Sequence, residues 1–170
     1  MKIKLPRFLR SPPAFSHAQA LQRLRRVGFT PATIYDIGAF HGGWTKAARK
    51  IFPTADFVLF EANADNAATL AASGERYVIA ALAAEDGVKK NLYLPKHAVA
   101  TGASLYREKT EHYAPDRVRI ETVTIRRLDA LAAEAHLPPP DLIKLDVQGA
   151  ELDVLAGAGD LLKNCTALIA

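Results

Sequence analysis

Two patterns of hydrophobic and polar positions alternate along this chain. Short runs rich in apolar, β-branched and aromatic residues predict buried strands, and segments with apolar residues three or four apart predict helices. From residue 33 onward the two kinds of segment follow one another. This order is typical of a mostly parallel α/β sheet with helices on both faces. The predicted core strands span 33–37, 56–60, 76–82, 142–147 and 166–169.

The helices are bounded by residues that commonly begin or end helices. Ser16 can cap a helix that runs to about Val27, and Gly28 stops it. Pro53 closes another predicted helix because proline cannot continue one. After the first, at 16–28, the predicted helices span 44–52, 65–72, 128–135 and 151–155.

The middle of the chain has a different pattern. Residues 88–94 and 118–125 alternate between apolar and polar, which predicts partly exposed strands. They form an excursion over about 88–126, with a turn-rich loop over 95–117 that we expect to shape the acceptor pocket. The predicted organisation is an irregular basic arm at 1–15 and one domain at 16–170, whose core is 33–170.

Composition fits a soluble globular chain. The 170 residues are 49% apolar and 24% charged, which is ordinary for one domain. Cys165 is the only cysteine, so neither an internal disulfide nor a cysteine-cluster metal site is expected. No apolar run approaches the roughly 20 residues that span a bilayer, and no long apolar stretch follows the basic N-terminus. We therefore expect a cytoplasmic protein without a transmembrane segment.

The positive net charge belongs to the N-terminal part. Residues 1–26 hold seven basic residues and no acidic one, whereas the rest holds 15 basic and 18 acidic residues. The arm suits weak peripheral contact with an acidic membrane or phosphate, or is a solvated tail. Because the domain itself is not basic, nucleic acid is not an expected partner.

A glycine-rich turn follows the first predicted strand. Gly38, Gly42 and Gly43 allow a sharp turn and a close approach to a ligand. Their spacing differs from Gly-x-Gly-x-x-Gly, so the dinucleotide fingerprint is not met. Either a tight connection or a ligand site fits this turn on its own.

An acidic residue directly follows the second predicted strand. Glu61 lies 23 residues beyond Gly38, where a carboxylate can accept both hydrogen bonds of a ribose diol. The two features together predict an adenosine-containing ligand. The absence of a Gly-Lys-Ser/Thr sequence argues against a nucleoside triphosphate.

A third group of polar residues ends the strand predicted at 142–147. Asp146, Gln148 and Glu151 fall on the same sheet edge as the first two features. Carboxylates there can orient a substrate hydroxyl, act as a base, or contact a sulfonium. Glu151 can instead merely complement a helix N-terminus.

These stretches resemble one known family. Residues 142–158, LIKLDVQGAELDVLAGA, are similar to the signature of the FkbM family of methyltransferases, and residues 35–42 and 60–63 match its first two motifs in order and spacing. Ala81-Leu82, Ala103-Ser104-Leu105 and Arg127-Leu128-Asp129 also fall where the family has comparable sequences. The resemblance covers about 33–170 and implies a Rossmann-like methyltransferase fold.

The resemblance implies S-adenosylmethionine as cofactor and, for most members, O-methylation of a hydroxyl on a sugar, glycolipid or secondary metabolite. It places Glu61 at the ribose, Ala81 and Leu82 near the adenine, and Asp146 where cofactor and acceptor meet. It places three residues on the methionine side (Asp36, Gly38 and Gly42) and adds Ala39, Ala62 and Asn63 to the cofactor site. The candidate bases are Asp146, Glu151 and His41, in that order; His41 stands where the family often has asparagine. His97 and His112 of the middle loop stay unassigned.

The end of the sequence raises an alternative. Ala170 lies in the fifth core strand, and such methyltransferases usually add two further strands, so we expect a fold truncated at that point. A non-catalytic remnant or binding module that keeps part of the cofactor pocket is therefore a second hypothesis. A homodimer would cover the exposed edge strand. Nicotinamide-dependent oxidoreduction is disfavoured by the glycine spacing.

Overall fold

The main sheet is five-stranded and parallel throughout, in the order β3-β2-β1-β7-β8. The computed structural model describes residues 16–96, 102–107 and 114–170. The strands are β1 (Thr33–Ile37), β2 (Asp56–Glu61), β3 (Arg76–Ile79), β7 (Leu142–Leu145) and β8 (Ala167–Ile169). The predicted Rossmann-like α/β fold is confirmed.

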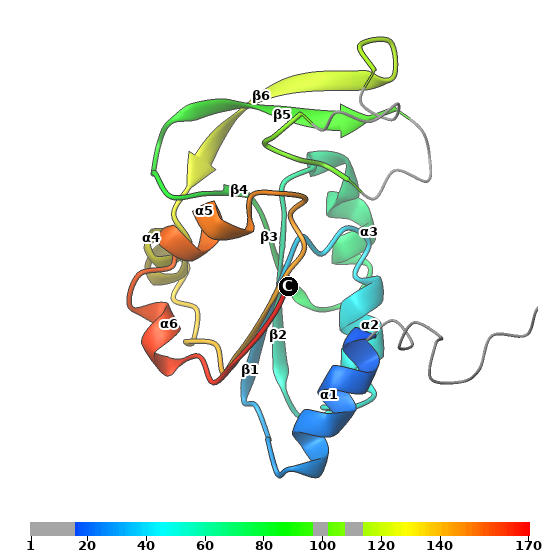
Figure 1. The fold of residues 1–170 in the computed structure, drawn as a ribbon, viewed down its shortest axis with the longest axis vertical. Helices are drawn as coiled ribbons and strands as arrows, with labels where there is room; N and C mark the ends of the chain where they lie inside the picture. The colour runs from blue at the N-terminus through cyan, green and yellow to red at the C-terminus, as the bar shows by residue number, and fades with distance from the viewer. Residues whose placement is uncertain (1–15, 97–101, 108–113) are drawn as a thin grey trace, which may run out of the picture.

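Helices cover both faces of this sheet (Figure 1). On one face lie α1 (His17–Arg26), α2 (Gly43–Arg49), the 3₁₀ turn η2 (Ala64–Asn66) and α3 (Ala67–Ala71), and on the other α4 (Leu128–Glu134), α5 (Glu151–Ala156) and α6 (Leu161–Asn164). Each face has its own apolar core. Leu21, Ala48 and Leu70 pack on the first face, and Leu128, Leu131 and Val154 on the second. Burial on both faces explains why the strands are nearly continuous apolar runs.

Alternation along β1 divides its side chains between the two cores. Tyr35 and Ile37 pack into the core under α4 and α5, and Ile34 packs into the core under α1 and α2. Asp36 is on the Ile34 face, since residues two apart in a strand share a face. Its register partner on the neighbouring strand is Lys144 of β7.

A second, smaller sheet crosses above the main one (Figure 1). It has the order β4-β6-β5, with β4 (Ala81–Leu82), β5 (Lys89–Pro95) and β6 (Val118–Arg126). The predicted single strand over 76–82 is wrong. The Ala80 N–H still donates to the Glu61 carbonyl at 2.8 Å, but the chain then leaves the main sheet and pairs with β6.

Three predicted boundaries also shift. The helix predicted over 44–52 ends at Arg49, because the Ile51 N–H bonds the Ala48 carbonyl in a tighter turn. The helix predicted over 65–72 begins as η2, where the Asn63 side chain accepts a hydrogen bond from the Asp65 N–H. The strand predicted over 142–147 ends at Leu145, so Asp146 lies in the following loop.

The basic arm at 1–15 and the histidines His97 and His112 lie outside the described residues. Among the described helices, none combines the length and apolar character that crossing a membrane requires.

Candidate functional site

The sheet reverses its winding between β1 and β7. The chain leaves β1 for β2 on one side, whereas β7 continues to β8 on the other. In open α/β sheets, ligands bind beyond the carboxyl ends of the strands at such a switch point. The glycine turn after β1 and the Asp146 loop after β7 meet here.

Gly38 allows these two loops to touch. A Cβ on Gly38 would lie 2.0 Å from the Asp146 carbonyl oxygen, far inside van der Waals contact, and its φ is +74°. The Asp146 N–H donates to the Ile37 carbonyl at 3.0 Å. The approach of backbone to backbone, with a positive φ, is the reason this position requires glycine.

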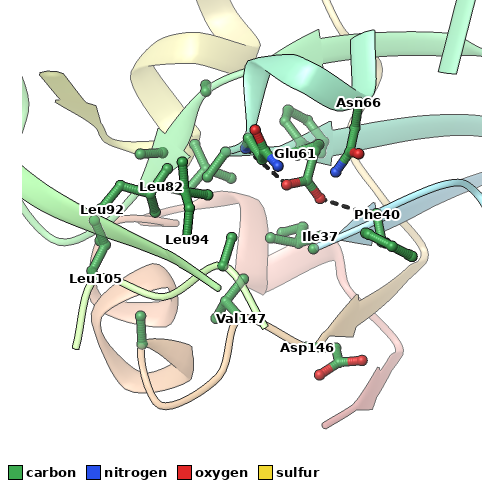
Figure 2. Close-up of a pocket in the computed structure, with 18 of the residues that line it drawn as sticks. Ile37, Phe40, Glu61, Asn66, Leu82, Leu92, Leu94, Leu105, Asp146 and Val147 are labelled. Carbon is green, nitrogen blue, oxygen red and sulfur yellow. Dashed lines mark hydrogen bonds between the residues drawn. The ribbon is translucent and has the colours of Figure 1, made fainter. Parts of the chain in front are cut away.

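A pocket lies above the meeting point and beneath the second sheet (Figure 2). It is a partly open concave site lined by both apolar and polar groups, the combination found in small-molecule and cofactor sites. Its wall combines backbone of the glycine turn, polar groups at the ends of β2 and β7, and apolar side chains. The lining residues are Ile37, Gly38, Phe40, Phe60, Glu61, Ala62, Asn63, Asn66, Ala80, Ala81, Leu82, Leu92, Leu94, Pro95, Ala103, Leu105, Asp146, Val147 and Ala150.

Glu61 is the carboxylate on the upper wall of this pocket. Its side chain is buried, and each oxygen accepts one backbone hydrogen bond: Oε2 from the Phe40 N–H at 2.7 Å and Oε1 from the Asn63 N–H at 2.8 Å. Because a carboxylate oxygen has two acceptor positions, each can still accept a ligand hydroxyl. The bonds also fix the Glu61 rotamer, so the carboxylate is held in place before a ligand binds.

The apolar end of the pocket is closed by the excursion. Leu92 and Leu94 of β5, with Leu105 from the segment that bridges to Tyr93, face Leu82 of β4 (Figure 2). These leucines form an apolar compartment next to Glu61. The excursion therefore walls the pocket beside the predicted ribose site, whereas its role in shaping an acceptor pocket stays a prediction.

The second sheet and residues 102–107 form a roof over the pocket, and polar contacts hold this roof to the core. Ser104, which is buried, donates to the Gln148 carbonyl at 2.7 Å, and the Tyr106 hydroxyl donates to the Asp153 carboxylate at 2.5 Å. The latter bond raises the pKa of Tyr106. On the opposite side, Arg119 of β6 pairs with Asp65 at 2.6 Å. The roof is therefore anchored on both sides of the pocket.

Asp146 lies at the other end, beyond β7, with its side chain half exposed. Its Oδ1 accepts a hydrogen bond from Gln148 Nε2 at 2.7 Å. Gln148 itself has a φ of +54°, which is unusual for a residue with a side chain. Glu151 braces this loop by accepting from the Val147 N–H at 3.1 Å and the Gly149 N–H at 3.0 Å. The loop thus presents a carboxylate to the pocket from a fixed backbone.

The structure separates the predicted site residues into two groups. Of the predicted cofactor residues, the pocket is lined by Gly38, Glu61, Ala62, Asn63, Ala81, Leu82 and Asp146, and not by Asp36, Ala39 or Gly42. Asp36 and Ala39 are buried behind the wall. Of the candidate bases, only Asp146 lines the pocket: Glu151 is engaged by backbone N–H groups, and exposed His41 stacks on Phe40 with ring centroids 3.7 Å apart.

Leu92, Leu94 and Lys144 are among the contributors that the sequence analysis does not name. Leu92 and Leu94 reach the site only because the excursion folds back over the sheet, which no local pattern encodes. Lys144 is different. It is the one charged residue in an otherwise apolar strand, and so is Asp36 in β1. A single charge of opposite sign in each of two buried strands indicates that Asp36 and Lys144 form an ion pair.

No group of three His, Cys, Asp or Glu side chains suited to holding a metal occurs in the described part of the chain.

Comparison with known proteins agrees with the geometry. Residues 36–170 match the model of the methyltransferase FkbM domain. The AMB antimetabolite synthetase AmbE of Pseudomonas aeruginosa is 38% identical over 91 residues, which are 52% of this chain and 4% of that protein. The chain therefore spans only a small part of that relative's length. No solved structure gives a significant match. The chain belongs to the FkbM methyltransferase family.

Proposed function

We propose that this protein binds S-adenosylmethionine and transfers its methyl group to a hydroxyl oxygen. The observation that carries the proposal is the order of groups in one pocket (Figure 2): the leucines, then Glu61, then Ile37 and Phe40 on either side of the glycine turn's start, with Asp146 at the far side. This order matches the adenine, ribose and sulfonium of the cofactor. The adenine base would pack against the leucines, and the ribose diol would donate hydrogen bonds to the buried Glu61 carboxylate. The positively charged sulfonium would lie near the Asp146 carboxylate.

In the proposed reaction the acceptor oxygen attacks the methyl carbon in line with the sulfonium. The new O–CH₃ bond forms as the S–CH₃ bond breaks, its electron pair stays on sulfur, and S-adenosylhomocysteine results. The hydroxyl proton leaves to a base, which we assign to Asp146 because its carboxylate lines the pocket and is accessible to solvent. Holding oxygen and carbon in line supplies most of the acceleration, up to roughly 7–11 kcal/mol in favourable cases.

The proposed acceptor is a hydroxyl on a sugar, glycolipid or secondary metabolite. The similarity to part of an antimetabolite synthetase supports the secondary-metabolite class among these. We place the acceptor at the Asp146 end of the pocket, because the Asp146 side chain there is half exposed.

The test is transfer of a labelled methyl group from S-adenosylmethionine to a panel of hydroxylated sugars, glycolipids and secondary metabolites. A labelled methyl ether with matching S-adenosylhomocysteine is the expected product. Asp146→Ala should abolish turnover, whereas Asp160→Asn, on an exposed side chain outside the pocket, should not. Near-normal turnover by the Asp146 variant would reject its role as base, and cofactor binding without transfer would favour the binding-module hypothesis.

A further inference from the structure

Two opposite charges are buried side by side beneath the pocket. Asp36 of β1 and Lys144 of β7 are register partners, and their residues are 0% and 3% exposed. Neither lines the pocket. Removing two charges from water is costly, and apolar residues of similar size at such positions are often at least as stabilising. The pair therefore calls for an explanation other than stability.

The contacts of the Lys144 ammonium supply one. Its Nζ lies 3.0 Å from Asp36 Oδ1 and donates a 2.8 Å hydrogen bond to the Gly38 carbonyl. It also lies 3.8 Å from Asp146 Oδ2. The second oxygen of Asp36 accepts a 2.6 Å hydrogen bond from the Thr45 hydroxyl of α2. One buried cation thus contacts both loops that form the floor of the pocket.

The two loops are in close backbone contact, so neither can shift without displacing the other. Gly38 and Asp146 already touch through their backbones, so a small shift of the Gly38 carbonyl changes the distance between the glycine turn and the Asp146 carboxylate. Lys144 holds that carbonyl from below while lying close to the carboxylate. The three charged groups comprise two carboxylates and one ammonium, so the surplus negative charge is on Asp146, which faces the pocket.

We propose that Lys144 is a positioning residue for the part of the pocket that receives the methionine and sulfonium end of S-adenosylmethionine. The inference rests on the proposed function and deepens it. Lys144 does not touch the cofactor. It fixes the distance between the glycine turn and Asp146, and its polar contacts are with the Gly38 carbonyl, Asp36 and Asp146 rather than with Glu61.

The experiment compares two ligands that share the adenosine part. S-adenosylmethionine carries the sulfonium and the amino acid, whereas 5′-deoxy-5′-methylthioadenosine lacks both. Calorimetry would measure both dissociation constants for the wild type, for Lys144→Met, and for the double variant Asp36→Asn with Lys144→Met. The double variant removes both buried charges, so it avoids leaving Asp36 unpaired. Lys163→Met, at an exposed lysine of α6, is the matched control.

Both Lys144 variants should bind S-adenosylmethionine about tenfold or more weakly, with less than about a twofold change for methylthioadenosine. The double variant should unfold at a urea concentration close to that of the wild type, and the control should match the wild type throughout. Unchanged binding of S-adenosylmethionine would overturn the proposal. So would a double variant that does not fold or that weakens both ligands equally, because the pair would then be structural only. If the wild type itself bound methylthioadenosine but not S-adenosylmethionine, or bound neither, the proposed function would fail and this inference with it.

Discussion

Replacing Gly38 by alanine perturbs the closest contact in the candidate site. The new Cβ would lie 2.0 Å from the carbonyl oxygen of Asp146 and 2.8 Å from its carbonyl carbon. Both atoms belong to the backbone, so no side chain can rotate away to make space. The glycine turn and the Asp146 loop would have to separate by more than 1 Å to reach ordinary contact, which is about 3.4 Å or more.

The expected cost has two parts. The φ of +74° at Gly38 imposes a left-handed backbone on alanine, which costs about 1–2 kcal/mol. Forcing packed groups apart typically adds about 1–3 kcal/mol. Gly38→Ala should therefore lower the free energy of unfolding by about 2–5 kcal/mol. It should also weaken cofactor binding, because the pocket floor is displaced.

Substitutions at two other glycines separate the cost of the positive φ from the cost of forcing the loops apart, measured by urea denaturation. Gly74 has a nearly identical φ of +76°, but no atom lies within 4 Å of the place that a Cβ would take, so Gly74→Ala should show the backbone cost alone. Gly43, the first residue of α2, has neither a positive φ nor a close neighbour, so Gly43→Ala should be neutral or stabilising. A Gly38→Ala protein as stable as Gly74→Ala, with unchanged cofactor affinity, would refute the claim that the two loops are held in rigid contact.

Two further changes test the roof and the core. Ser104→Ala leaves the Gln148 carbonyl and the Tyr106 N–H without their partner at a buried site, so the free energy of unfolding should fall by about 1–3 kcal/mol. The control Ser73→Ala, at an exposed serine, should lower it clearly less. Equal losses for the two variants in urea denaturation would count against a tightly docked roof. Burial raises the pKa of Tyr35 to about 12 from an ordinary 10.0. Between these values the folded state keeps the phenolic proton and the unfolded state loses it. The stability that is present below pH 10 is therefore lost as pH rises toward 12. Tyr35→Phe lacks this proton, so its stability deficit relative to the wild type should shrink by about 2 kcal/mol between pH 9 and pH 11.5; a deficit that does not change with pH would show that Tyr35 ionises normally.

Local patterns were enough to predict most strands of the main sheet. The buried runs at 33–37 and 56–60 are strands at almost those limits, because a strand covered on both faces must be apolar throughout. Ser16 and Gly28 bracket α1 through cap chemistry that is local in sequence. The order of Gly38, Glu61 and Asp146 along the chain predicted one shared sheet edge, since parallel strands bring their carboxyl ends together.

What the sequence did not predict depends on long-range contacts. The run 76–82 is uniformly suited to a strand, so nothing local marks the point after Ala80 where pairing passes from β2 to β6. Leu92 and Leu94 alternate like any half-buried strand, and only the fold of the excursion directs them to the pocket. Asp36 pairs with Lys144, which lies 108 positions further along the chain, and it is not among the residues that line the pocket.

Titration of S-adenosylmethionine into the purified protein tests the central claim most directly. The wild type should bind it and S-adenosylhomocysteine in the micromolar range and should not bind NAD. Glu61→Gln should weaken both about tenfold or more, because ribose hydrogen bonds to a charged carboxylate are worth about 1.5–3 kcal/mol each. Glu85→Gln, exposed and outside the pocket, should have no effect. Folded wild-type protein that binds no S-adenosylmethionine, or binding that is indifferent to Glu61, would contradict the account.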